Sequence, residues 1–408
     1  MKLIGPFRQI VTMNGLPLRG ALSDGQLEII PNGGILVAER KILAIGNFEE
    51  IKRSYNPSEI DRLNTAYVAF PGLIDAHTHL CWAGSRADDY ALRLSGKSYL
   101  EIAAQSGGIW DTVQKTRNIP DKELILLVAE RANALLKQGV TTIEVKSGYG
   151  LLVEQELRLL DIIRKADNET SAELISTCLA AHIVPKDFIG TEEKYLETVL
   201  KQLLPEVKYQ RLSNRIDIFV DEGAFSVLAA KEYLRKAKAM GFEVLLHGDQ
   251  FSTGAAQLAI EVGARSIDHL EAANDDEIQI LAKGNVIPVA LPGASLGLGE
   301  PFAPARKLLD AGASLAIASD WNPGSAPMGN LLVEAAILGV KEKLSMAETW
   351  AALTFRAAAA LNLADRGILA KGNLADIAAF KTDNFKEILY QQGELKPEKV
   401  WKNGYRVI

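Results

Sequence analysis

The sequence predicts a parallel (β/α)8 barrel joined to a small β-sandwich domain that is built from both ends of the chain. Between residues 72 and 320, short runs rich in β-branched residues recur eight times, and stretches with a charged helical pattern separate most of them. This repetition is typical of a closed parallel barrel, whose active site forms where the strands end at the C-terminal face. At both ends of the chain, the runs instead alternate apolar and polar residues between turns.

The N-terminal part reads as short strands joined by turns. Residues 27–46 alternate around the turn Asn32-Gly33-Gly34, which is a hairpin-like pattern. After about Asp365, the strand-like segments GILAKGNLADIAAF and PEKVWKNGYRVI follow. We expect these to rejoin the N-terminal strands, so that residues 1–69 and 366–408 form one composite β domain beside a barrel of residues 70–365.

The barrel strands are predicted from the eight runs in chain order. They cover residues 72–79, 140–146, 174–182, 216–221, 243–248, 266–270, 286–291 and 315–320. The alternative, a doubly wound open sheet, needs a switch point and usually a glycine-rich phosphate loop. No GxGxxG motif follows the first run, so the barrel is favoured.

The composition argues against several classes of protein. A net charge of −6 disfavours nucleic acid or an anionic membrane surface as the main partner. No apolar run approaches the ~20 residues that a bilayer span needs, and the first residues do not resemble a signal peptide. Only Cys81 and Cys178 are present, which gives no disulfide framework. We therefore expect the protein in a reducing cytoplasm.

The five histidines share one position in this pattern, because each lies at or near the C-terminal end of a predicted strand. Histidines in ordinary core or surface roles would scatter into helices and loops. A catalytic metal site takes about three protein ligands from His, Asp or Glu and leaves a position for water. The predicted ligands are His77, His79, His247 and Asp320, with His269 close by.

These motifs resemble the amidohydrolase superfamily of metal hydrolases, which combines HxH on the first strand, His on the fifth and sixth, and Asp on the eighth. Within it, TTIEVKSGYGL, EGAFS, DHLE, SDWNPGSAP and the SGGI at 106–109 are similar to the imidazolonepropionase family. That resemblance implies hydrolysis of 4-imidazolone-5-propanoate to N-formimino-L-glutamate. It also implies one Zn²⁺ or Fe³⁺ ion on the four ligands, and a homodimer.

The resemblance further implies a set of substrate contacts. They are Arg86, Tyr149, His182, Gln250, Asn322, Gly324 and Ser325. A guanidinium suits the propionate because it donates two charge-assisted hydrogen bonds. A neutral His182 could bond either the ring carbonyl or a ring nitrogen. The Gln250 amide can present a donor and an acceptor but cannot act as a base, so proton transfer falls to Asp320, assisted by His269.

The expected mechanism needs no covalent enzyme intermediate. Metal-bound water loses a proton to Asp320, the hydroxide attacks the ring carbonyl, and His269 and the metal stabilise the oxyanion. Asp320 then returns the proton to the leaving ring nitrogen. Another cyclic amide hydrolase or a deaminase on the same barrel remains an alternative. A non-catalytic protein on a degenerate barrel would lack a ligand, and none is missing.

Several nearby residues are expected to be structural. Lys146 is predicted to form an ion pair, and Asp75 to support the site without binding metal. Glu222 and Glu271 are either partners that orient a histidine or ordinary loop carboxylates. Positions that depart from the family pattern are Trp321, Ser325 and the segment LPGASLGLGE.

Overall fold

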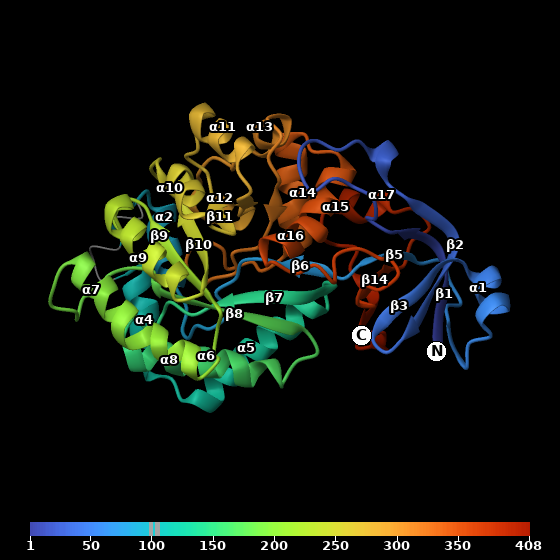
Figure 1. Ribbon diagram of the computed structural model, residues 1–408, viewed down its shortest axis with the longest axis horizontal. Helices are drawn as coiled ribbons and strands as arrows, with labels where there is room; N and C mark the ends of the chain where they lie inside the picture. The colour runs from blue at the N-terminus through green and yellow to red at the C-terminus, as the bar shows by residue number, and fades with distance from the viewer. Residues whose placement is uncertain (98–100, 103–106) are drawn as a thin grey trace.

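The computed structural model describes residues 1–97, 101–102 and 107–408. A barrel occupies the left and centre of Figure 1, and a second sheet that contains both chain ends lies at the right. Eight parallel strands pair in chain order from β6 to β13. They are β6 Leu73–Asp75, β7 Val140–Lys146, β8 Glu173–Ala181, β9 Arg215–Val220, β10 Glu243–Gly248, β11 Ser266–His269, β12 Ile287–Ala290 and β13 Ala316–Ile317. The predicted fold class is thereby confirmed.

The first and last barrel strands meet through an irregular seam. Thr78 and Trp321 form an isolated parallel bridge, and the Asp320 N–H donates to the His77 carbonyl at 3.0 Å. The Asp75 carboxylate accepts hydrogen bonds from Ser319 N at 3.0 Å and Ser319 Oγ at 2.5 Å. The predicted strands 72–79 and 315–320 are therefore too long, since regular pairing stops at Asp75 and Ile317. The supporting role predicted for Asp75 is confirmed.

Helices cover the outside of the barrel between successive strands. They are α2 Ala87–Leu94, α4 Ile109–Asn118, α5 Asp121–Leu136, α6 Val153–Asp167, α7 Glu192–Thr198, a π-helical turn Val199–Leu203, α8 Leu204–Tyr209, α9 Val227–Ala239, α10 Ala255–Val262, α11 Asp275–Lys283, α12 Pro292–Leu298, α13 Ala305–Asp310, α14 Leu331–Glu342, α15 Met346–Ala352 and α16 Phe355–Ala360. Helix α9 shows why they form. Ser226 caps its first turn, and Ala230, Tyr233, Leu234 and Ala237 bury one face at helical spacing.

The second sheet mixes strands from both ends of the chain, in the order β16-β15-β14-β5-β1-β2-β3, with β4 also paired to β1. Its strands are β1 Lys2–Val11, β2 Ile29–Ala38, β3 Lys41–Asn47, β4 Glu59–Arg62, β5 Val68–Pro71, β14 Ile377–Phe380, β15 Pro397–Lys402 and β16 Tyr405–Arg406. The segments that connect its strands contain three short helices, which are the 3-10 turn Asp24–Gln26, α1 Phe48–Tyr55 and α17 Lys386–Tyr390. The predicted return of the C-terminal strands is confirmed, whereas the exact domain limits stay a prediction.

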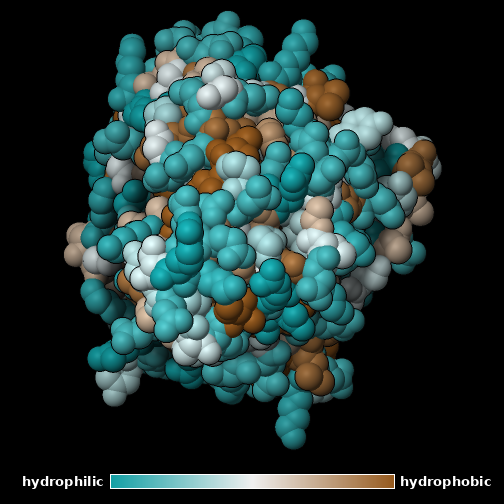
Figure 2. All heavy atoms as spheres, turned by 90° about the vertical axis from the view of Figure 1, so that its right-hand side faces the viewer, coloured by the Kyte–Doolittle hydropathy of each residue, from teal (hydrophilic) through white to brown (hydrophobic). Residues whose placement is uncertain are grey.

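The two sheets are joined where β5 leads into β6. Phe70 on β5 stacks on Trp350 of α15 with ring centroids 3.8 Å apart, and Gly72 N donates to Asp376 O. Figure 2 shows the end of the molecule that carries the mixed sheet, where hydrophilic side chains surround separate hydrophobic patches. Within the described part of the chain, no helix has the length and apolar character needed to cross a membrane.

Candidate metal centre and active site

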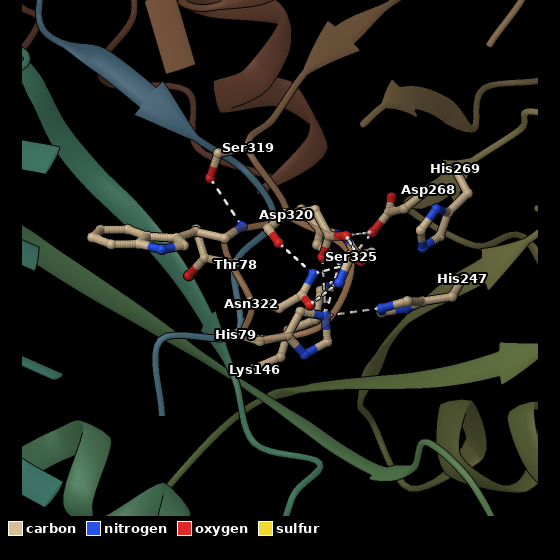
Figure 3. Close-up of polar contacts among 12 residues, drawn as sticks. Thr78, His79, Lys146, His247, Asp268, His269, Ser319, Asp320, Asn322 and Ser325 are labelled. Carbon is tan, nitrogen blue, oxygen red and sulfur yellow. Dashed lines mark hydrogen bonds and ion pairs between the residues drawn. The ribbon is translucent and has the colours of Figure 1, made fainter. Parts of the chain in front are cut away.

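Four predicted ligand groups converge at the C-terminal end of the barrel. His77 and His79 follow β6, His247 lies on β10, and Asp320 follows β13. The Nε2 atom of His79 is 3.3 Å from the Nε2 atoms of both His77 and His247. Asp320 Oδ1 is 3.4 Å from the Nε2 atoms of His77 and His79. In Figure 3, His79 and His247 point toward each other.

The donor set fits one shared cation. His77 Nδ1 is 2.7 Å from Asp268 Oδ2, and His247 Nδ1 is 3.0 Å from Asp217 Oδ2. Each carboxylate favours the Nδ1–H tautomer, which leaves Nε2 as a lone pair that faces the other donors. Ligands at about 2.0–2.1 Å from one ion, at tetrahedral angles, lie about 3.3 Å apart. This spacing separates His79 from His77 and His247, and Asp320 from His77 and His79. Acceptor nitrogens that face one another cannot form hydrogen bonds with one another. A single cation would bind their lone pairs together.

The protonation of these groups also suits a metal. Burial lowers the pKa of His77 and His79 well below the usual value, and lowers that of His247 to about 3 despite the opposing effect of Asp217. The imidazoles are thus neutral at neutral pH and free to act as ligands. Burial raises the pKa of the Asp320 carboxyl to about 7, so a bound cation would have to displace a proton below that pH.

A buried charge network lies beneath the four donors. Lys146 Nζ is 2.8 Å from Glu144 Oε1, 2.7 Å from Asp217 Oδ2 and 3.6 Å from Asp268 Oδ2. Burial lowers the pKa of Lys146, but Asp217 and Glu144 raise it to a value above its usual range. The predicted ion-pair role of Lys146 is confirmed. The three carboxylates were not predicted from the sequence, although a charged residue inside a buried parallel strand was the available signal.

His269 ends β11 with a positive φ of 91°. Its Nδ1 lies 3.4 Å from Glu271 Oε2. Burial lowers the pKa of His269, but the carboxylates of Glu271 and Asp320 outweigh that effect and raise it overall. Glu271 is thus the carboxylate that accompanies this histidine, whereas Glu222 is exposed in its loop.

A small cavity opens above the donors. It brings together most of the predicted site residues, namely His79, Arg86, Tyr149, His182, His247, Gln250, His269, Asp320, Asn322 and Ser325. His77 and Gly324 do not line it. The apolar part of the wall comes from Ile109, the last residue of the SGGI motif, and from Phe219, Phe251 and Leu298, which were not predicted from the sequence. Ser106 of the SGGI motif lies outside the described residues.

Arg86 places a guanidinium in the cavity wall. The side chain is buried, and Nε donates to Asp89 Oδ2 at 2.7 Å. Gly324 lies directly against the guanidinium, because a Cβ atom at this position would come within 2.3 Å of Arg86 Nη1. Gly324 is therefore placed to make room for Arg86.

His182 has one ring nitrogen already engaged. Its Nδ1 is 3.0 Å from the Gly148 carbonyl, which can only accept, so Nδ1 carries the proton and Nε2 is an acceptor. Burial lowers the pKa of His182 to about 4, which keeps the ring neutral. The ring of Tyr149 lies 5.6 Å from that of His182 and 5.9 Å from that of His79, between centroids.

Asn322 organises the loop after β13. Its Nδ2 donates to Asp320 O at 2.6 Å and to Ser325 Oγ at 2.9 Å, and its Oδ1 accepts from Gly324 N and Ser325 N. Ser325 Oγ in turn lies 3.3 Å from Asp320 Oδ2. Both side chains thus support Asp320. Trp321 does not line the cavity; its ring lies 6.1 Å from that of Trp82.

Comparisons with known proteins agree with this geometry. The amidohydrolase family model matches residues 68–407. Imidazolonepropionase of Bacillus mycoides strain KBAB4 is 39% identical over 402 residues, which cover 97% of this chain and 94% of that protein. Imidazolonepropionase of Bacillus cereus strain AH187 gives the same identity and coverage.

Solved structures share the fold at low sequence identity. A mutant of atrazine chlorohydrolase from Arthrobacter aurescens TC1, complexed with zinc and atraton, has a TM-score of 0.74 at 17% identity and covers 100% of this chain and 95% of its own. An adenosine deaminase from Xanthomonas campestris with bound zinc has a TM-score of 0.73 at 18% identity, with coverages of 99% and 92%. The family match over residues 68–407, together with the imidazolonepropionase homologues, shows that this chain belongs to the amidohydrolase family.

Proposed function

We propose that this protein is a metal-dependent hydrolase that opens the ring amide of 4-imidazolone-5-propanoate to give N-formimino-L-glutamate. The observation that carries the proposal is 39% identity to imidazolonepropionases over 97% of the chain. The cavity supports it, because a buried guanidinium, three converging histidines and the nearby Asp320 lie in or beneath one small pocket. A substrate with a carboxylate at one end and a cyclic amide at the other matches that pairing.

The side chains suggest how the substrate would be held. Arg86 would bind the propionate, with the Tyr149 phenol near it on the wall. Because Nε2 of His182 is an acceptor, it would receive a ring N–H and would not donate to the carbonyl. The Gln250 amide would complete the polar edge of the pocket, since it offers both a donor and an acceptor.

The reaction adds one water across the ring C–N bond. A cation on His77, His79, His247 and Asp320 would supply hydroxide at neutral pH, because metal binding lowers the pKa of water from about 15.7 to about 7. Asp320 would accept the proton of the attacking water and return it to the leaving ring nitrogen. His269 would donate, in its protonated form, toward the oxygen that gains negative charge, and the raised pKa of its imidazole favours that form. The carbonyl carbon thereby gains the hydroxyl, and the ring nitrogen gains the hydrogen.

We propose Zn²⁺ or Fe³⁺ as the cation. Three imidazoles and one carboxylate accept either ion, and zinc is present in two solved structures of the same fold.

The test is an assay of freshly purified protein with imidazolonepropionate, combined with metal analysis. We expect turnover that a chelator abolishes and added Zn²⁺ or iron restores. Arg86→Met should raise KM for this substrate and leave the bound metal in place. Amino-purines and hydantoins serve as comparison substrates, and turnover of those alone would contradict the proposal in favour of a related deaminase or cyclic amide hydrolase.

A further inference from the structure

The ammonium of Lys146 is buried at the base of the metal centre, although the expected chemistry does not use it. The side chain is fully buried on β7, and its three carboxylate neighbours come from three different strands. Glu144 is two residues away on β7, Asp217 lies on β9, and Asp268 lies on β11. A buried cation of this kind costs free energy unless its partners compensate it, so its placement calls for an explanation.

Two of these carboxylates connect the lysine to the metal donors through a single oxygen atom each. Asp217 Oδ2 is 2.7 Å from Lys146 Nζ and 3.0 Å from His247 Nδ1. Asp268 Oδ2 is 3.6 Å from Lys146 Nζ and 2.7 Å from His77 Nδ1. The Lys146 ammonium is thus connected through these carboxylates to two of the three ligating histidines.

The remaining oxygens are also fixed. Asp217 Oδ1 accepts from Ile218 N at 2.7 Å, and Asp268 Oδ1 accepts from Ser266 Oγ at 2.7 Å. Each carboxylate is therefore held at both oxygens, and its rotation is restricted. Without the ammonium, the Oδ2 atoms would lose the attraction that holds them and would repel each other in a medium of low dielectric.

We propose that Lys146 is a positioning residue of the metal centre, which holds Asp217 Oδ2 and Asp268 Oδ2 where they orient His247 and His77. It acts on the metal through these carboxylates and touches neither the metal nor the substrate. Partners that orient a metal ligand typically change metal affinity by about 10–100-fold when they are removed. The inference rests on the proposed function, because it assumes that the four donors bind a cation.

The chain offers two matched controls. Lys402 is another buried lysine between two carboxylates, with Nζ 3.1 Å from Glu173 Oε2 and 2.8 Å from Asp376 Oδ2, and it lies in the mixed sheet. Glu144 touches Lys146 but contacts none of the ligating histidines in the described part of the chain. Lys402→Met therefore tests the loss of a buried ion pair elsewhere, and Glu144→Gln tests the loss of a charge within the network.

The experiment measures Zn²⁺ affinity of the full-length apoprotein by competition with a chromophoric chelator, and the visible absorption of the Co²⁺-substituted protein. Lys146→Met should lose about 10–100-fold in Zn²⁺ affinity and show a changed Co²⁺ spectrum. Lys402→Met and Glu144→Gln should keep both properties of the wild type, even where thermal stability falls.

Wild-type affinity and an unchanged spectrum in Lys146→Met would overturn the proposal. If Lys146→Met does not fold, the double variant Glu144→Gln/Lys146→Met takes its place. It removes one positive and one negative charge together, and it should show the same loss of Zn²⁺ affinity. A wild-type protein that takes up no Zn²⁺ would instead overturn the proposed metal site itself, so the two failures are distinguishable.

Discussion

Asp320 combines two roles in the proposed centre, as a metal ligand and as a group that transfers a proton. It lies 3.4 Å from two histidine nitrogens as a candidate ligand, and it is also the group proposed to move a proton. Burial raises its pKa to about 7, whereas burial lowers the pKa of the three histidines far below neutral pH. Among the four donors, Asp320 is thus the one that exchanges a proton near neutral pH.

The affinity of the apoprotein for Zn²⁺ should therefore depend on pH through Asp320. Below pH 7 the ion must displace the carboxyl proton, so affinity should rise as the pH increases and level off above about pH 7. Chelator competition at a series of pH values measures this. Asp320→Asn should bind Zn²⁺ more weakly and with a flatter pH profile, and a wild-type affinity that falls with pH over this range would contradict the assignment.

The loop after β13 links the metal donors to the side of the cavity that carries Arg86. Asn322 holds it from inside with four hydrogen bonds, which fix Asp320 at one end and Gly324 at the other. Arg93 Nη2 also donates to the Gly324 carbonyl at 3.0 Å, which ties α2 to the same loop. The loop therefore sets the distance between Asp320 and Arg86.

Gly324→Ala should disturb Arg86 and leave the metal donors in place. The added methyl group would come within 2.3 Å of Arg86 Nη1, so the guanidinium must move. We expect KM for imidazolonepropionate to rise about 10-fold or more, since a charged hydrogen bond contributes ~1.5–3 kcal/mol. Metal content should not change.

The control for this variant is Gly25→Ala. A Cβ atom at this exposed position would have no neighbour within 4 Å, so steady-state kinetics should match the wild type. An unchanged KM in Gly324→Ala would contradict the role given to this contact.

At the scale of the whole molecule, the mixed sheet fastens the two chain ends to the barrel. Strand β14 pairs with β15 on one side and with β5 on the other. The C-terminal strands therefore join the sheet through a strand from the N-terminal part of the chain. Trp401 on β15 is fully buried, and its ring lies 6.1 Å from that of Phe7 on β1. The stability of this sheet thus depends on contacts between residues almost four hundred positions apart in the sequence.

Trp401→Ala should lower the free energy of unfolding by about 3–5 kcal/mol, because it leaves a large cavity in this core. Denaturant titration measures the loss, and Tyr405→Ala, at a residue that is 71% exposed on the neighbouring strand, is the control. Turnover per folded molecule should remain that of the wild type. A stability loss no larger than that of the control would contradict the role of Trp401. The expected homodimer also belongs to this scale and stays a prediction.

Much of the fold was predictable because its signals are local. Eight buried strand runs with helical segments between them indicate a barrel, and histidines at strand ends indicate where its site lies. Strand limits at the seam were not predictable. Regular pairing stops at Asp75 and Ile317 because the segments that carry His77 and Asp320 bond across the seam.

The sequence by itself determined which side chains could form the centre, because strand order brings the C-terminal ends of β6, β10 and β13 to one face. The tertiary structure decided how they are held. Asp217, Asp268 and Lys146 meet only when strands β7, β9 and β11 close around the barrel interior. Backbone positions likewise decide the hydrogen bond between His182 and the Gly148 carbonyl, and the hydrogen bond from Asn322 to the Asp320 carbonyl. Spacing along a chain does not encode such contacts, because they are set by packing in three dimensions.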